Sequence, residues 1–267
     1  MKYKIDHDYH IHSNLSTCAS KLGLLPECIL RCAKATGLSR ICLTNHYWDS
    51  AVPGASEWYV PQDFEHLCKA KPLPTDKDVE IFFGCEADMD KNFTIGIPKE
   101  RYHDFDFIIV STTHVHMNGF TITEAERYSN QARADLWVKR FDALLQKDLP
   151  FHKVGIAHLP TFKADNRSRE NYLKTLSLIP SDEMERLFSK AAELGCGIEI
   201  NQGDMSFSDS EADTVLRALR IAKACGCKFY LGSDAHRASR FATSREIFER
   251  AIDMLDLKES DKFYFER

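Results

Sequence analysis

The stretch CKFYLGSDAH (residues 227–236) is a short apolar run that stops at a glycine and is followed at once by ionisable side chains. Aromatic and aliphatic residues in a run of this length, bounded by a turn former, are typical of a strand buried on both faces in a parallel sheet. Asp234 and His236 follow this strand at its C-terminal end. Because side chains alternate between the two faces of a strand, these two residues are expected to point the same way.

The same arrangement of an apolar run, an ionisable residue and a loop recurs through the rest of the chain. The other runs are IDHDYHIHS (5–13), RICLTNH (40–46), VEIFFGCEAD (79–88), FDFIIVSTTH (105–114), KVGIAHLP (153–160) and CGIEINQG (196–203). Each is predicted to be a buried parallel strand. Strands that alternate with helical patterns indicate a parallel α/β architecture, which is compatible with an open doubly wound sheet or a closed barrel.

Helical patterns fill most of the intervals between these strands. Residues 26–36 begin at Pro26 and stop before Gly37, and residues 124–147 and 182–194 carry apolar residues at helical spacing. Two further helices are predicted after Ser210 and after Thr243, where Thr243 and Glu246 have capping-box spacing. Residues 47–78 are irregular and are expected to form a long loop with one short helix around 64–68. No linker divides the chain, so residues 1–267 are assigned to one domain.

The position of the ionisable residues favours a closed barrel over an open sheet. An open sheet gathers chemistry at one switch point, from only a few strands. Barrel enzymes assemble their active sites from the C-terminal ends of many strands, and here each of the seven runs ends in a candidate. Parity along the strands supports convergence, because His10 and His12 share a face, as do Glu199 and Asn201.

Composition and charge exclude several classes of function. The formal net charge is −5 and the pI is about 6.1, so the chain lacks the basic footprint of a protein that binds duplex nucleic acid. The first residues lack the apolar core of a signal peptide, and no run approaches membrane-spanning length, so a cytoplasmic protein is expected. The nine cysteines are irregularly spaced and are expected to be reduced.

The strand ends together predict a metal centre. A single histidine at a strand end is more often a hydrogen-bonded core residue than a ligand, but burying many titratable groups in one place requires compensation by metal ions. Imidazoles mixed with carboxylates suit Zn²⁺, Mn²⁺ or Fe, and Glu86 is placed to bridge ions in a cluster of two or three. The predicted ligands are His10, His12, His46, Glu86, His114, His158, Asp234 and His236.

These motifs resemble the polymerase and histidinol phosphatase (PHP) family of metal-dependent phosphoesterases. The matching stretches run in the family's order: DYHIHS (8–13), TNH (44–46), GCEAD (84–88), STTH (111–114), IAHLP (156–160), EIN (199–201) and GSDAH (232–236). The resemblance implies a distorted (β/α)₇ barrel. It also implies one ion held by His10, His12, Glu86 and Asp234, a second by Glu86, His114 and His158, and a third by His46 and His236.

The third ion site depends on a cysteine. Relatives complete this site with a histidine or aspartate from the loop after the first strand, where the present chain has Cys18. A thiolate is a good ligand for Zn²⁺, so Cys18 is a candidate ligand. The alternative is that Cys18 does not coordinate and that the third ion is weakly bound or absent.

The implied reaction is hydrolysis of a small phosphate monoester by a metal-bound hydroxide, with Asp234 and Glu86 as the catalytic residues. The length and the DYHIHS opening are like those of histidinol phosphatases, but the arginines expected after His158 and after EIN are missing. Two other hypotheses stay open: an amidohydrolase, which would commonly add a strand-borne lysine, and a non-catalytic module. The candidate substrate-binding residues are Lys163, Arg237, Arg240, Asn201 and His116.

Overall fold

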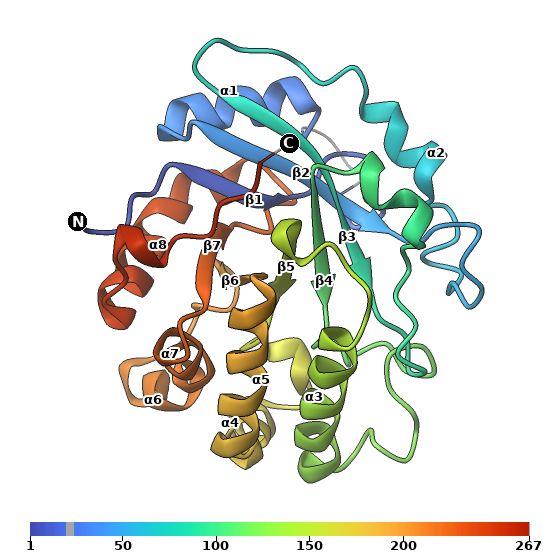
Figure 1. The fold of residues 1–267 in the computed structure, drawn as a ribbon, viewed down its shortest axis with the longest axis vertical. Coiled ribbons are helices and arrows are strands. Elements are labelled where there is room, and N and C mark those ends of the chain that lie inside the picture. The colour runs from blue at the N-terminus through green and yellow to red at the C-terminus, as the bar shows by residue number, and fades with distance from the viewer. Residues whose placement is uncertain (20–23, 267) are drawn as a thin grey trace.

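Seven parallel strands form a barrel in strict sequence order (Figure 1). The structure is a computed structural model that describes residues 1–19 and 24–266. All six neighbouring strand pairs are parallel. The strands are β1 (His7–Ile11), β2 (Arg40–Tyr47), β3 (Glu80–Asp88), β4 (Phe107–Ser111), β5 (Val154–Ala157), β6 (Gly197–Asn201) and β7 (Lys228–Gly232).

The first and last strands meet and nearly close the barrel. Just beyond β7, the Asp234 amide donates to the His10 carbonyl at 2.8 Å, and the His12 amide donates to the Ala235 carbonyl at 3.1 Å. Ile11 and Ala235 form an isolated parallel bridge. The seven predicted strands and the distorted (β/α)₇ barrel are therefore confirmed, and the open sheet is excluded.

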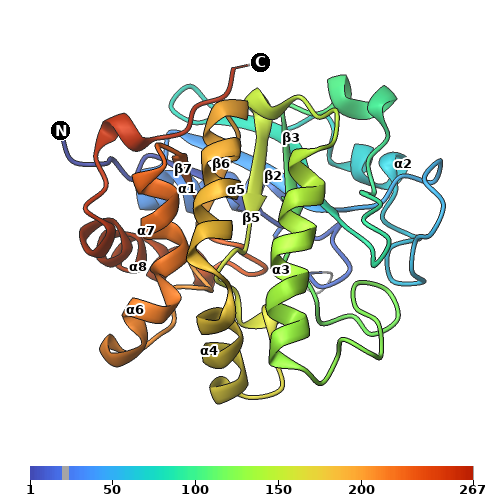
Figure 2. The ribbon, with the colours of Figure 1, turned by 60° about the horizontal axis from the view of Figure 1, so that its bottom comes forward.

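Helices cover the outside of the barrel. Helices α3, α5 and α7 stand side by side against one part of the wall (Figures 1 and 2), while α1 and α8 pack together near β1. The described helices are α1 (Pro26–Thr36), α2 (Phe64–Leu67), α3 (Asn130–Leu145), α4 (Arg169–Leu178), α5 (Ser181–Leu194), α6 (Ala212–Val215), α7 (Arg217–Ala224) and α8 (Ser239–Leu255).

Three helix predictions need correction. The helix predicted over 124–147 begins only at Asn130, because the Ser129 side chain caps it by accepting from the Ala132 amide. The helix predicted after Ser210 is divided into α6 and α7 at Leu216. Thr243 is not an N-cap, since α8 already begins at Ser239. Helix α4 was not predicted, whereas α1, α2 and α5 lie where the sequence placed them.

Aromatic rings fill the N-terminal half of the barrel. Tyr9, Phe82, Phe107 and Tyr230, from four different strands, form a buried cluster with Phe263 and Phe265 from the C-terminal tail. The Phe265 ring stacks on Phe107 with 4.7 Å between centroids. The Phe263 amide also donates to the Phe229 carbonyl at 2.7 Å. The tail therefore seals this end of the barrel and leaves the opposite end for the polar side chains.

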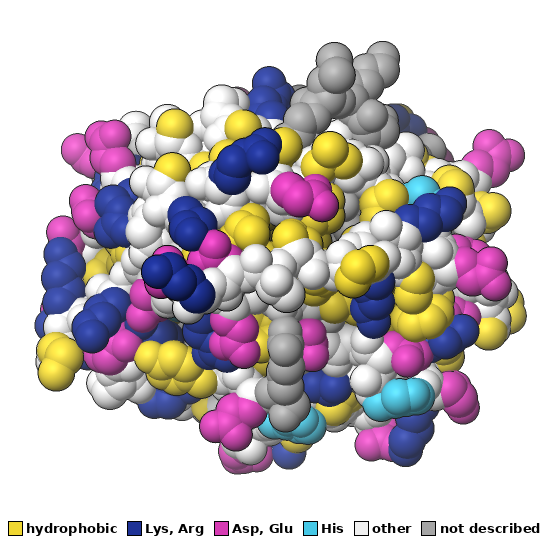
Figure 3. Space-filling model, turned by 90° about the horizontal axis from the view of Figure 1, so that it is seen from above, with side chains coloured by type: hydrophobic (Ala, Val, Ile, Leu, Met, Phe, Trp, Pro, Cys, Tyr) yellow, Lys and Arg dark blue, Asp and Glu magenta, His cyan; other side chains and the backbone are white. Residues whose placement is uncertain are grey.

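The surface carries mixed charge. On the face shown in Figure 3, the visible Lys and Arg side chains are interleaved with Asp and Glu. This pattern agrees with the formal net charge of −5, and it does not form the single basic stripe expected of a protein that binds duplex nucleic acid. Among the described residues, no helix is long and apolar enough to cross a membrane.

Candidate metal centre

The C-terminal ends of the strands bring the predicted ligands to one end of the barrel. Most of these side chains are buried, while Asp234 and His236 are partly exposed and Cys18 is exposed. The strands aim the ligands inward because alternate residues face the barrel interior. Thus Phe82 and Glu86 of β3 point inward, while Cys85 and Ala87 pack in the outer core against the helices.

His10, His12 and Asp234 converge at the junction of β1 and β7. The Nε2 atoms of His10 and His12 lie 3.2 Å apart, and His12 Nε2 lies 3.0 Å from Asp234 Oδ1. Ligand atoms that are each about 2.1 Å from one ion are roughly 3.0–3.5 Å from one another. The spacing of these three side chains therefore fits a shared ion.

Glu86 lies at the centre of the site and offers its two oxygens in different directions. Its Oε2 lies 2.9 Å from His46 Nδ1 and 3.3 Å from the Nε2 atoms of both His10 and His12. Its Oε1 lies 3.7 Å from His158 Nε2 and 3.9 Å from His114 Nε2. A carboxylate in this position is able to bridge two ions.

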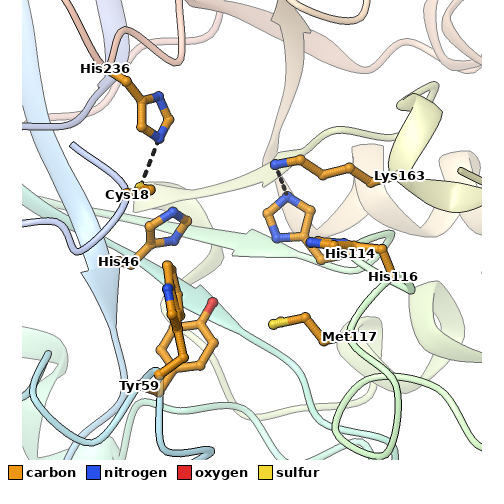
Figure 4. Close-up of a pocket in the computed structure, with 9 residues that line it drawn as sticks. Cys18, His46, Tyr59, His114, His116, Met117, Lys163 and His236 are labelled. Atoms are coloured by element: carbon orange, nitrogen blue, oxygen red, sulfur yellow. Dashed lines mark hydrogen bonds between the residues drawn. The ribbon is translucent and has the colours of Figure 1, made fainter.

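Cys18 lies with three histidines in a separate group. Its Sγ is 2.9 Å from His236 Nε2 (Figure 4). One ligand atom from each of His12, Cys18, His46 and His236 falls within 4.8 Å of the others. Although Cys18 as a residue is exposed, its thiol lies among these histidines, and this desolvation, together with the charges of Glu86 and Asp234, raises the pKa of the thiol to about 12. A cation in this group would favour the thiolate instead.

Most of the histidines are held from behind by a second side chain. His10 Nδ1 lies 2.6 Å from Glu199 Oε1, His114 Nδ1 lies 3.2 Å from Asp88 Oδ2, and His158 Nδ1 lies 3.3 Å from Asp204 Oδ2. Such carboxylate–imidazole pairs fix the tautomer and turn Nε2 toward a metal, although His114 Nε2 also lies 3.3 Å from Lys163 Nζ. His12 Nδ1 is held by the Ser16 hydroxyl at 3.0 Å.

Close packing makes the His10–Glu199 pair possible. A Cβ atom added at Gly232 would lie 2.0 Å from Glu199 Oε1 and 2.7 Å from the Cβ of His10. Only glycine leaves room for the carboxylate between β6 and β1. The glycine of the GSDAH stretch is therefore a requirement of the site itself.

Among the residues that the structure describes, several buried polar atoms at the centre make no hydrogen bond of good geometry. They include His46 Nδ1, Glu86 Oε2 and His158 Nε2. Unpaired buried polar atoms are costly, and here they face one another across a short gap. This arrangement, together with a donor set of imidazoles, carboxylates and one thiol, fits divalent transition metals.

The charges at the centre are strongly coupled. Burial alone would raise the pKa of the Glu86 carboxyl, but His46 and His10 hold that pKa well below its usual range. The pKa of Asp234 is likewise held low against burial by His12 and His10. Burial lowers the pKa of His46 to about 4, so its ring is neutral and available as a ligand.

Two ligand candidates have an unusual backbone conformation. His158 has a φ of 60° and Asp234 a φ of 50°, both in the left-handed region. Residues other than glycine pay roughly 1–3 kcal/mol in such a conformation, which is found most often at functional sites. Asp256, the C-cap of α8, has the same conformation, so the positive φ alone does not identify a functional residue; at His158 and Asp234 it accompanies a place in the cluster of candidate ligands.

A cavity of about 430 Å³ opens directly over the site (Figure 4). Lys163, from the 3₁₀ helix η4 (Phe162–Ala164), reaches into it and places Nζ 3.3 Å from His114 Nε2. Burial opposes the charge on Lys163, but the carboxylates of Asp234 and Glu86 raise its pKa overall. The lining residues are Cys18, His46, Trp58, Tyr59, His114, His116, Met117, Lys163 and His236.

Comparison with known proteins agrees with this geometry. Residues 8–203 match the PHP domain family. The chain belongs to this family. No curated protein matches the chain.

Two solved structures resemble this PHP domain over nearly its whole length. One is a histidinol phosphate phosphatase from Lactococcus lactis in complex with zinc, L-histidinol and phosphate, with 19% identity, a TM-score of 0.57 and coverage of 92% of this chain and 93% of that one. The other is a candidate histidinol phosphatase from Listeria monocytogenes, with 12% identity, a TM-score of 0.61 and coverage of 91% and 100%. At these identities the likeness shows the fold.

The candidate substrate-binding residues of this PHP domain lie in different places. Lys163 and His116 line the cavity. Asn201 lies at the end of β6 with its Nδ2 buried and unpaired. Arg237 is exposed, and Arg240 lines a separate hollow next to Gln202 and Gly203. Neither arginine is among the described residues that line the cavity over the metal centre.

The supporting carboxylates Asp88 and Asp204 were missed by the sequence reasoning, and Glu199 was noticed only for its parity with Asn201. For Asp88 the signal was available, since it lies two residues after Glu86 and on the same face of β3. Asp204 follows a turn after β6, and no periodicity pointed to it.

Proposed function

We propose that this PHP domain is a metal-dependent phosphatase that hydrolyses small phosphate monoesters. The observation that carries the proposal is the buried carboxylate of Glu86, whose two oxygens face separate sets of histidine nitrogens. The Lactococcus lactis relative holds zinc and phosphate on the same fold. Metal ions held by this carboxylate, together with Lys163 in the cavity, would supply the positive charge that an anionic ester needs.

The proposed centre holds two to three ions of Zn, Mn or Fe. One would be held by His10, His12, Glu86 and Asp234, and a second by Glu86, His158 and His114. His114 is the loosest member of the second set, because it lies 3.9 Å from Glu86. A third ion would be held by His46, His236 and Cys18, and His12 lies close enough to join this set.

The proposed reaction uses the bound ions, Lys163 and Asp234 in different ways. Bound ions would lower the pKa of a coordinated water and neutralise charge on the phosphoryl oxygens. Lys163 is placed to pair with a phosphoryl oxygen, because its Nζ reaches into the cavity and lies 3.3 Å from His114 Nε2. Asp234, or a histidine beside it, accepts the proton released by the attacking water and returns it to the leaving oxygen.

Metal analysis combined with a panel of phosphorylated metabolites tests this proposal. The purified protein should contain at least two equivalents of transition metal and release inorganic phosphate from at least one ester. Glu86→Ala should lower kcat/KM roughly a thousandfold, which corresponds to a rise of about 4 kcal/mol in the activation free energy, because it removes the proposed bridging ligand. The exposed Glu100 gives the matched control Glu100→Ala, which should leave activity unchanged.

Three outcomes would contradict the proposal. Less than one equivalent of metal would exclude the cluster. Turnover of amides or lactones in place of phosphate esters would favour the amidohydrolase alternative, and a metal-loaded protein inert to both classes would favour a non-catalytic module.

A further inference from the structure

The wall of the cavity opposite Lys163 is aromatic and apolar. Trp58 and Tyr59 come from the long loop between β2 and α2, and Met117 comes from the segment after β4. The Trp58 ring contacts the His46 ring edge to face, with 4.9 Å between the ring centroids. It contacts the Tyr59 ring in the same way, with 4.7 Å between the centroids. In Figure 4 the Met117 thioether extends toward Tyr59 across the cavity. The space above the metal centre is therefore bounded by broad, uncharged surfaces.

This wall is held in place from several sides. The Tyr59 hydroxyl donates to Asp88 Oδ2 at 2.9 Å, and its ring packs against Trp48 and Phe120. The Trp58 carbonyl accepts from Gln62 Nε2 at 3.0 Å, while Gln62 Oε1 accepts from the Thr17 amide. Since Thr17 precedes Cys18, the loop that carries Trp58 is tied to the metal centre. A ligand would meet a formed surface, which lowers the entropic cost of binding.

The side chains that line the cavity include one cation, while the carboxylates of Glu86 and Asp234, which stabilise the charge on Lys163, belong to the proposed metal centre and do not line the cavity. None of the nine described lining residues carries a carboxylate, and Lys163 contributes a positive charge. The nearby carboxylate of Asp88 already accepts from Tyr59 and lies against His114. An ammonium group in the cavity would find no free counter-charge on this wall.

We infer that Trp58 is a specificity-determining residue and that the preferred substrates are phosphate esters of planar, uncharged alcohols or phenols, whose ring lies against Trp58 while the phosphate meets Lys163 and the metal centre. This inference rests on the proposed phosphatase function. It predicts discrimination against alcohols that carry an amine. L-Histidinol, the alcohol bound by the Lactococcus lactis relative, is such an amine.

A matched pair of aryl phosphates tests the inference. 4-Propylphenyl phosphate and tyramine O-phosphate have nearly the same size and similar phenol leaving groups, and they differ by an ammonium in place of a methyl group. With the metal-loaded protein at pH 7, kcat/KM should be roughly tenfold or more higher for the propyl ester, because the ammonium must be desolvated without a partner.

Substitution of Trp58 tests whether its contact with the substrate ring affects binding (KM) without affecting the chemical step (kcat). Trp58→Ala should raise KM for the propyl ester by roughly three- to tenfold with a small change in kcat, since aromatic contacts contribute that order of affinity. Methyl phosphate, which has no ring, should show little change. Trp58→Phe should restore most of the loss. Tyr128→Ala removes an exposed aromatic outside the cavity and serves as the matched control.

The outcomes distinguish this inference from the function on which it rests. If the tyramine ester is hydrolysed as well as the propyl ester or better, the inference is overturned while the phosphatase function stands. An unchanged KM in a folded Trp58→Ala variant also overturns it. If the metal-loaded protein hydrolyses no phosphate ester, the proposed function and the inference both fail.

Discussion

The carboxylate of Glu199 serves two residues of the metal centre at once. Its Oε1 lies 2.6 Å from His10 Nδ1, and its Oε2 accepts from the His158 backbone amide at 3.0 Å. One buried side chain therefore orients a ligand on β1 and positions the backbone of another ligand after β5. The strained φ of His158 is held partly by this contact.

Glu199→Gln should weaken metal binding by roughly 10- to 100-fold with little loss of fold, because the amide no longer favours the His10 tautomer that leaves Nε2 free. Competition with a chromophoric chelator measures this directly. Glu100→Gln, on the exposed surface, is the matched control. Unchanged affinity in the Glu199 variant would mean that the contact with His10 is only structural.

The clustering of the proposed ligands was predictable from sequence, and the side chains that support them were not. The histidines stand at strand ends, where a period of two and the barrel architecture place them together. The partner behind a ring depends instead on which strands are neighbours and on how closely they approach. Asp204 reaches His158 across β6 and β5, and Glu199 reaches His10 only because Gly232 leaves space. These distances are properties of packing that a local sequence pattern does not contain.

At the scale of elements, helix α3 both covers the barrel and holds two loops beside the proposed metal centre. Its Arg140 is fully buried and donates to the backbone carbonyls of Met89, Asp90, Thr112 and Thr121. Met89 and Asp90 directly follow Asp88, the last residue of β3, and Thr112 and Thr121 lie in the segment after β4 that carries His114. A single guanidinium thus joins the two loops on one side of the metal centre.

Arg140→Met should destabilise the fold by about 3 kcal/mol or more, because it leaves several buried carbonyls without a donor. Urea denaturation of the metal-free protein measures this loss without a contribution from bound ions. Lys139→Met changes a neighbouring exposed residue on the same helix and should cost less than about 0.5 kcal/mol. Equal stabilities of the two variants would rule out the role given to Arg140.

The limits of prediction at this scale have a physical cause. The strands were located correctly because each is a compact apolar run with clear ends. The start of α3 was placed six residues too early, since residues 124–129 are compatible with a helix until the Ser129 cap is recognised. Arg140 was not recognised at all, because an arginine on a helix is normally expected to face solvent.

At the scale of the whole molecule, the two ends of the barrel have opposite characters. The metal centre occupies one end, and the C-terminal tail occupies the other. Lys262 in the tail is buried and pairs with Asp6 just before β1, with both carboxylate oxygens 3.0 Å from Nζ. This ion pair joins the tail to the first strand.

The Asp6 pair predicts a defined pH dependence of stability. Burial opposes ionisation of Asp6, but hydrogen bonds from His7 and Lys262 lower its pKa to about 2. Its value in the unfolded chain is about 3.9. The folded state therefore favours the ionised form, and the resulting stabilisation is complete above about pH 4 and is lost as the pH falls toward 2.

Melting temperatures from pH 7 to pH 2.5 test this dependence. The difference between the native chain and Asp6→Asn should be largest near neutrality and should narrow below pH 4. Asp213→Asn, at a side chain that is 95% exposed, should show no such convergence. A difference for Asp6→Asn that stays constant across this range would contradict the assignment.

The aromatic seal made by Phe263 and Phe265 also has a consequence for biosynthesis. On the ribosome, β1 is synthesised well before its neighbour β7 and the two rings, Phe263 and Phe265, that fill the N-terminal half of the barrel. At about 5–20 residues per second, the nascent chain waits roughly 10–50 s between Ile11 and Phe263. During that interval the polar strand ends and the apolar floor are both uncovered. Barrel closure is therefore a late event in synthesis, because β1 must wait for β7 and for the rings of Phe263 and Phe265.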